Sequence, residues 1–187
     1  VKGLKDQRAR VVETAKGKDA EVFDDEMLIY VAAHWTKDNL RIFAIDYHFE
    51  DPKIKPDLVI IDGDTKKTVK RIQGVYSNEG RNPLWQTVSP DGKRYFVYHT
   101  KKVEVFDLDS GKRICTLGAE LKRLPTQPGI QLELQRMIST DGKRVVTLNK
   151  KNSAVLWDTD KATPLALFET TKFACSVCAF SSDGKQL

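Results

Sequence analysis

The five-residue pattern Ser-x-Asp-Gly-Lys occurs three times in this sequence, and it constrains the fold more than any other feature. The copies are Ser89–Lys93, Ser139–Lys143 and Ser181–Lys185, spaced 50 and 42 residues apart. In each copy Ser or Asp can hydrogen-bond the local backbone, and Gly can adopt the positive φ angle that closes a tight hairpin. A hairpin turn that recurs at this spacing predicts an array of repeated β units.

Each of the first two turns is followed by three segments rich in β-branched and aromatic residues, separated by short polar connections. Such segments are typical of strands. Together with the segment before the turn they predict a unit of four short strands. The segments after the turns are Tyr95–Tyr98, Val103–Asp107, Arg113–Leu117, Val145–Leu148, Ala154–Asp158 and Pro164–Phe168.

A degenerate copy of the unit precedes these two. Leu58–Asp62 and Thr68–Ile72 match the third and fourth strands of the later units, and Glu21–Val31 is expected to form the first hairpin. Counted from that hairpin to the next turn, this copy is about 24 residues too long. We therefore expect an insertion at about 34–56, with one extra strand at Leu40–Asp46.

The units resemble the WD40 class of β-propeller repeat, with Ser-Pro-Asp-Gly-Lys before the second strand and Trp-Asp at the end of the third. The resemblance implies an all-β fold of propeller blades, each with four antiparallel strands. It covers about three blades plus one hairpin, an incomplete ring over residues 20–187, and leaves residues 1–19 as a linker or the outer strand of a preceding blade. The residues that carry it are Ser89–Lys93, Phe106-Asp107, Ser139–Lys143, Trp157-Asp158 and Ser181–Lys185.

The sequence also departs from the WD40 pattern. The Gly-His pair ahead of the first strand is absent, and Thr100 and Lys151 replace the Asp found seven residues before the Trp-Asp aspartate. The His-Ser-Asp-Trp hydrogen-bond network of such blades is therefore incomplete, and a related propeller class remains an alternative. Because the sequence starts at Val1 and stops where a second strand should begin, we expect a segment of a longer protein with further blades.

Three cysteines are too few for a disulfide framework and favour a reducing compartment, such as the cytoplasm. Cys175 and Cys178 take the two Val positions of the first strand in the last unit, which implies core positions. The alternative for this C-x-x-C pair is metal or redox chemistry, but no second pair accompanies it. We expect no metal and no cofactor.

The net charge of +5 arises from 31 basic and 26 acidic residues. The lysines recur about once per turn, so we interpret them as solvated turn residues. A nucleic-acid-associated propeller is the alternative. Apolar runs such as Leu28–Ala33 fall far short of the roughly 18 residues of a membrane-spanning helix, and no membrane is expected as a partner.

The resemblance implies a non-catalytic scaffold that binds other proteins and, within its parent chain, the remaining blades. Fold alone does not fix function. Exposed aromatic and Arg residues are the expected interaction residues, although Trp85 can instead pack between blades and Trp157 takes the core Trp position of the family. The candidates are Trp35, Tyr47, Arg81, Trp85 and Arg123.

The alternative is a propeller-based hydrolase or oxidoreductase, or a regulatory propeller attached to a catalytic domain outside this segment. The sequence holds no G-x-S-x-G, no phosphate-binding glycine loop and no H-E-x-x-H. Asp62, Asp107 and Asp158 recur beside turns, where a structural role explains them. His99 follows an apolar strand and is interpreted as a strand-end residue.

Overall fold

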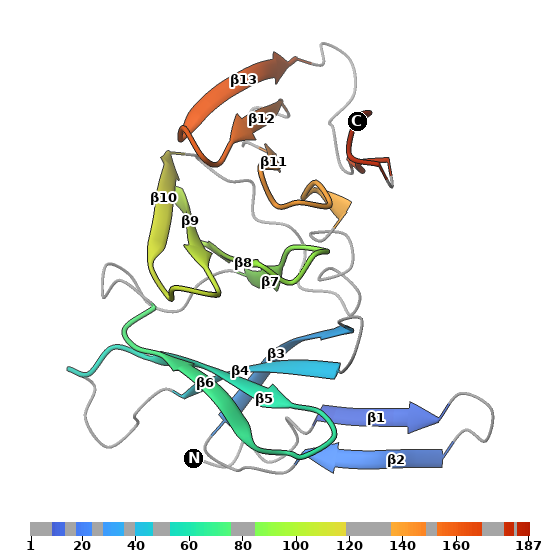
Figure 1. The fold of residues 1–187 in the computed structure, drawn as a ribbon. Helices are drawn as coiled ribbons and strands as arrows, with labels where there is room; N and C mark the ends of the chain where they lie inside the picture. The colour runs from blue at the N-terminus through green and yellow to red at the C-terminus, as the bar shows by residue number, and fades with distance from the viewer. Residues whose placement is uncertain are drawn as a thin grey trace. The chain divides into compact units, whose positions relative to one another are not determined.

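A computed structural model describes residues 9–13, 18–23, 28–35, 40–46, 53–75, 85–118, 136–148, 153–169, 178–181 and 183–187. These residues form strands and turns with almost no helix, and all the strand pairs among them are antiparallel. The prediction of an all-β fold is therefore confirmed. The chain divides into two compact units, Val1–Asn78 and Glu79–Leu187 (Figure 1).

Within the described residues, no helix has both the length and the apolar character needed to span a bilayer.

The first unit contains a two-stranded sheet and a four-stranded sheet. Strands β1 (Ala9–Glu13) and β2 (Lys18–Phe23) pair with each other. Residues 9–13 are therefore extended. The four-stranded sheet runs in chain order through β3 (Leu28–Trp35), β4 (Leu40–Asp46), β5 (Asp57–Asp62) and β6 (Thr68–Ile72).

The predicted strand at Leu40–Asp46 is confirmed as β4, whereas the expected first hairpin is wrong. Glu21–Val31 does not form a hairpin, because its two halves belong to β2 and β3, which pair with β1 and β4. Leu40–Asp46 is β4, which pairs with β3 on one side and β5 on the other. The described part of 34–56 thus contains a central strand of the four-stranded sheet, and the insertion itself stays a prediction.

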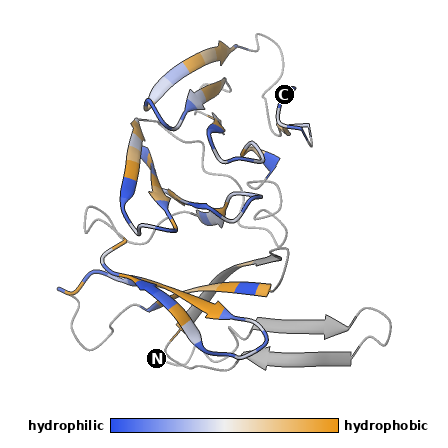
Figure 2. Ribbon diagram, viewed as in Figure 1, coloured by the Kyte–Doolittle hydropathy of each residue, from blue (hydrophilic) through white to orange (hydrophobic). Residues whose placement is uncertain are grey.

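The burial of β4 and β5 explains why β4 lies in the middle of the four-stranded sheet. Ile42, Ala44 and Ile45 are at most 2% exposed, and β5 is buried along its whole length. An apolar strand of this kind is stable only between two neighbours, where its backbone groups and both faces are covered. Figure 2 shows the hydrophobic stretches of β4 and β5 adjacent to each other.

The second unit contains one four-stranded and one three-stranded sheet. The first runs through β7 (Trp85–Val88), β8 (Arg94–Tyr98), β9 (Lys102–Asp107) and β10 (Arg113–Gly118). The second runs through β11 (Arg144–Leu148), β12 (Ala154–Asp158) and β13 (Thr163–Phe168). Ile138 forms a single bridge to Val145, where the first strand of that sheet is expected. The six strands predicted after the first two turns are confirmed.

The two sheets of the second unit share one hydrophobic core. Phe96, Val105 and Leu117 from the first sheet pack with Val145 and Val146 from the second, and all five side chains are fully buried. Side chains of Cys115, Trp157, Cys178 and Phe180 pack partly buried against this core. The predicted core positions of Trp157 and Cys178 agree with this packing, whereas Cys175 lies outside the described residues.

Candidate functional site

The three Ser-x-Asp-Gly-Lys turns, which we call the turn cluster, share one hydrogen-bond scheme. Each serine Oγ accepts the backbone N–H of the residue five positions later, at 2.9 Å. It donates to the aspartate Oδ1 at 2.6, 2.7 and 2.6 Å, and this Oδ1 accepts the lysine N–H at 3.0, 3.0 and 3.1 Å. The side-chain bonds to the local backbone that the sequence predicts are confirmed.

The glycine of each turn has the backbone conformation that the sequence predicts. The φ angles of Gly92, Gly142 and Gly184 are 71°, 68° and 68°. Each glycine N–H donates to the carbonyl oxygen of the serine three positions earlier, at 2.8 to 2.9 Å. The left-handed conformation closes the turn at little cost only because glycine has no Cβ atom.

These hydrogen bonds favour the charged form of the turn aspartates. Partial burial raises the pKa of Asp141, but hydrogen bonds from the Lys143 N–H and the Ser139 hydroxyl outweigh it, and the pKa is below its ordinary value. The Ser181 hydroxyl and the Lys185 N–H likewise lower the pKa of Asp183. Asp141 and Asp183 are therefore ionised acceptors committed to their own turns.

Consecutive turns contact one another. The Asp91 N–H donates to the Thr140 carbonyl oxygen at 3.1 Å, which joins the first turn to the second. A Cβ atom on Gly142 would lie 3.0 Å from the Ser89 Cβ, and one on Gly184 would lie 3.7 Å from the Ser139 Cβ. The three turns thus follow each other in one direction at one end of the second unit.

The turn between the third and fourth strands lies against the Ser-x-Asp-Gly-Lys turn of the same repeat. The Leu108 N–H donates to the Lys93 carbonyl oxygen at 2.8 Å, and the Thr159 N–H donates to the Lys143 carbonyl oxygen at 2.9 Å. Both kinds of turn therefore lie at the same end of their sheet.

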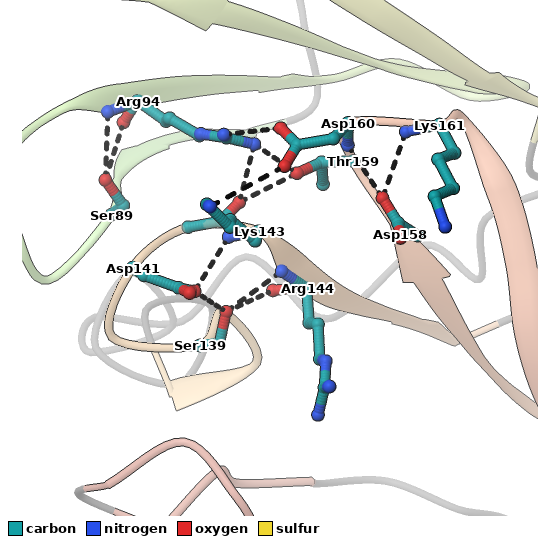
Figure 3. A network of polar contacts seen from close by, with 11 residues as sticks. Ser89, Arg94, Ser139, Asp141, Lys143, Arg144, Asp158, Thr159, Asp160 and Lys161 are labelled. Carbon is teal, nitrogen blue, oxygen red and sulfur yellow. Dashed lines mark hydrogen bonds and ion pairs between the residues drawn. The ribbon is translucent and has the colours of Figure 1, made fainter.

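Arg94 connects the first of these sheets to the second (Figure 3). Its guanidinium donates to the Gly142 carbonyl oxygen at 3.4 Å, to the Thr159 hydroxyl, and to Asp160 Oδ1 at 2.6 Å. The Thr159 hydroxyl in turn donates to the Gly142 carbonyl oxygen at 3.0 Å, and Lys143 Nζ lies 3.9 Å from Asp160 Oδ2. Thr159 and Asp160 are thus held together by groups from two successive turns.

A cavity of about 490 Å³ lies among these turns. This volume is within the range of about 300–1,000 Å³ that ligand sites occupy. Among the described residues, the Arg144 guanidinium and the Lys185 ammonium make no hydrogen bond or ion pair. The cavity is lined by Asp91, Ser139, Thr140, Asp141, Lys143, Arg144, Asp158, Asp160, Asp183, Gly184 and Lys185.

The recurring aspartates at the ends of the third strands have the structural role that the sequence predicts. Asp62 Oδ1 accepts the Thr65 N–H at 2.8 Å, and Asp107 Oδ1 accepts the Ser110 N–H at 2.6 Å. Asp158 Oδ1 accepts the N–H groups of Asp160 and Lys161 at 2.9 and 3.0 Å. Each carboxylate caps the turn that follows its strand.

A second polar group, separate from the turn cluster, surrounds Glu104 on β9. Glu104 is 1% exposed, and its carboxyl oxygens lie 2.9 Å from His99 Nε2 and 2.9 Å from Arg113 Nη1. Burial lowers the pKa of His99 below its ordinary value, although Glu104 acts in the opposite direction. His99 is therefore a neutral, buried residue at neutral pH.

The cysteines that the structure describes, Cys115 and Cys178, are free thiols, both partly buried. Burial raises the pKa of the Cys115 thiol to about 11, which makes it a poor nucleophile. In the described ranges, no three His, Cys, Asp or Glu residues are arranged to hold a metal ion.

Of the five predicted interaction residues, Trp35 and Trp85 lie within the residues that the structure describes. The backbone of Trp35 ends β3 in the first unit, and the backbone of Trp85 begins β7 in the second. Tyr47, Arg81 and Arg123 lie outside the described residues. These five residues stay a prediction.

The sequence interpretation missed the connection made by Arg94, Thr159 and Asp160. A signal was present, because Arg follows the pattern directly in the first two turns, at positions 94 and 144. The partner residues were not visible in sequence, since 65 positions separate Arg94 from Thr159.

No family model matches this chain, and no curated protein is similar enough to it to count as a match.

Proposed function

We propose that this chain is a non-catalytic protein–protein interaction scaffold built from WD40-type repeats, with four-strand sheets that correspond to propeller blades. The observation that carries the proposal is the identical hydrogen-bond scheme of the three turns. One local structure repeated along a chain is the mark of an array, in which each repeat contacts its neighbours.

Two further observations support WD40-type repeats. Trp157 Nε1 donates to Thr147 Oγ1 at 2.8 Å, which corresponds to the Trp–Ser link of the WD40 network, with Thr in place of Ser. The sheets of the second unit also bury their faces against each other, as adjacent blades do. A sheet packed in this way leaves its turns free for binding.

The turn cluster is the surface that we assign to binding. Its carboxylates are occupied by their own turns, and its cations Arg144 and Lys185 line a cavity that another protein can enter. Arg is a frequent binding residue at protein interfaces. The five residues expected from the sequence are further candidates for the same role.

The test is affinity purification with the full chain as bait, in three forms. These are the native chain, the double charge reversal R144E/K185E, and the control K101E/K112E, which reverses two exposed lysines outside the cavity. We expect proteins retained by the native chain and the control to be lost from R144E/K185E. Retention of no protein above the level of an empty support would contradict the scaffold function.

An enzyme is the second candidate, and the His99–Glu104 pair favours it. A histidine 2.9 Å from a carboxyl oxygen is the arrangement of a base with an orienting group. His99 is 8% exposed and Glu104 is 1% exposed, so a substrate would have little access to either. Hydrolase or oxidoreductase turnover that disappears in His99→Ala would support this candidate over the scaffold.

A further inference from the structure

Two edge strands in the first unit differ in charge, and no described strand pairs with the outer side of either. β6 is the last strand of the four-stranded sheet, and β2 is one of the two strands of the smaller sheet. A strand at the edge of a sheet directs alternate backbone N–H and C=O groups outward, where another strand can pair with them. Within one chain, β2 and β6 belong to separate sheets and do not pair.

The edge formed by β6 is basic. Segment 66–71, which contains most of this strand, has no acidic residue. Val69 and Arg71 are exposed, and Arg71 Nη1 donates to Asp46 Oδ2 at 2.7 Å and to Asp57 Oδ2 at 3.3 Å. The charge of Arg71 is thus balanced within its own sheet, and the lysines give the edge its positive charge. The cations of the segment are Lys66, Lys67, Lys70 and Arg71.

The sequence of β2 complements that of β6. The strand contains Asp19 and Glu21, and residues 19–26 contain no basic residue. Opposite charges on neighbouring strands stabilise their pairing, and like charges oppose it. β6 also offers an exposed apolar side chain, because the register shift between β5 and β6 leaves Val69 opposite no residue of β5, and Val69 is 50% exposed.

The last strands of the two sheets in the second unit do not offer this combination. β10 has one basic residue, Arg113, whose guanidinium lies 2.9 Å from the buried Glu104. β13 has no charged residue, and its Pro164 has no N–H group for a further strand. Lysines on an edge disfavour the addition of apolar or basic strands. The strand that β6 selects is therefore an acidic one.

The two-stranded sheet has the most to gain from a further strand. An isolated pair of strands is marginally stable in water, and three or more strands are needed for independent stability. Among the described strands, β1 and β2 pair only with each other. Addition of β6 to the outer side of β2 would join the two-stranded sheet to a four-stranded one.

We propose that β2 of one copy of this chain pairs with β6 of a second copy, so that the chain associates with itself. The backbone groups at the two outer edges supply the hydrogen bonds. The carboxylates of Asp19 and Glu21 offset the ammonium charges of Lys67 and Lys70 across the contact. This inference goes beyond the proposed scaffold function and does not depend on it.

The direct test is sedimentation velocity of the full chain over a range of concentrations. The native chain should associate as its concentration rises. The double charge reversal K67E/K70E should raise the dissociation constant by at least about tenfold, because it places acidic residues on both strands. The reversal D19K/E21K should have an effect of the same size, because both strands are then basic.

An equimolar mixture of these two variants adds a measurement that a merely structural role of the four residues would not affect. In the mixture each acidic edge meets a basic edge of the other variant, so association should return. A variant that misfolds would not be rescued in this way, and far-ultraviolet circular dichroism checks the fold of each. The matched control K101E/K112E, which reverses two exposed lysines outside β6, should associate as the native chain does.

Amide hydrogen exchange locates the contact. As the concentration of the native chain rises, exchange should slow in β2 and β6, where outer N–H groups become hydrogen-bonded. Exchange in β10, which is also the last strand of its sheet, should not change with concentration.

Four results would overturn the proposal. They are a native chain that sediments as a monomer up to about 0.1 mM, equal association of the native chain and K67E/K70E, a mixture of the two variants that stays monomeric, and association without slower exchange in β6. The last result would locate the contact elsewhere on the chain. The affinity purification tests the scaffold function separately, so each proposal can fail without the other.

Discussion

Single residues in the turn cluster serve both the local turn and the contact between repeats. Gly142 has a positive φ angle, and its missing side chain also leaves the space that Arg94 crosses to reach Asp160. Gly184 has the same φ angle but no neighbour closer than 3.7 Å to its Cβ position. Substitutions at these two glycines therefore distinguish two contributions to the free energy of unfolding. One is the strain of a left-handed backbone, and the other is the steric clash of an added Cβ atom.

Gly142→Ala should destabilise the protein more than Gly184→Ala. Each substitution places alanine in a left-handed conformation, at about 1–2 kcal/mol. Only Gly142→Ala also brings a Cβ atom within 2.9 Å of Arg94 and 3.0 Å of Ser89. Urea unfolding of both variants measures the difference, and equal losses would contradict the close passage of Arg94 over Gly142.

Acid should weaken the turn cluster. Because the pKa of Asp141 is lower in the folded protein than its ordinary value, the folded state favours the ionised form. The resulting stability is fully present above the ordinary pKa of about 3.9 and is lost as the pH falls through the lowered value. We expect the free energy of unfolding to decrease on acidification below about pH 5.

Asp141→Asn is the matched variant for this pH dependence. It retains an acceptor oxygen but cannot titrate, so its unfolding free energy should depend less steeply on pH than that of the native chain between about pH 5 and pH 3. Parallel pH profiles for the two proteins would show that Asp141 contributes nothing to acid sensitivity.

At the scale of the strand, apolar segments were predicted well, and their pairing was not. The strands after the two complete turns were predicted because β-branched and aromatic residues alternate with clear turn residues. In the first unit the sequence predicts a hairpin over Glu21–Val31, although β2 and β3 pair with different partners. Pairing depends on long-range burial, which local turn chemistry does not report.

The same distinction applies to the candidate site. The turns themselves were predictable, because Ser, Asp and Gly act within five residues of each other. The partners of Arg94 were not, because the sheets bring together residues of separate repeats. The polar group around Glu104 was missed for a related reason, since a buried glutamate on a strand gives no pattern in the sequence.

Ile42→Ala should reveal β4 as a central strand. Ile42 is 2% exposed and packs in the core of the first unit, so its truncation should cost about 2–5 kcal/mol. Val69→Ala on β6, where the side chain is 50% exposed, is the control and should change stability by less than about 0.5 kcal/mol. Chemical unfolding measures both, and a neutral Ile42→Ala would contradict the burial of β4 in this core.

At the scale of the whole molecule, the exposed large apolar residues described on the strands of the second unit lie on its last strand, β13. Leu165, Leu167 and Phe168 on β13 are 50%, 56% and 44% exposed, whereas Leu117 on β10, the corresponding strand of the other sheet, is fully buried. The sheet of β7–β10 is covered by the next sheet, and the sheet of β11–β13 is covered less completely. This difference in the exposure of apolar side chains is expected for repeats that depend on their neighbours for burial.

The account of repeats that contact their neighbours is tested at one contact, the ion pair of Arg94 with Asp160. The measurement that tests it most directly is a double-mutant cycle of Arg94→Met and Asp160→Asn, with unfolding free energies from urea titrations. We predict a coupling energy of about 1 kcal/mol, because Arg94 is mostly buried and also bonds Thr159. The control cycle, Arg144→Met with Asp160→Asn, should be additive. Additivity of the Arg94 cycle within about 0.3–0.5 kcal/mol would contradict this contact between repeats.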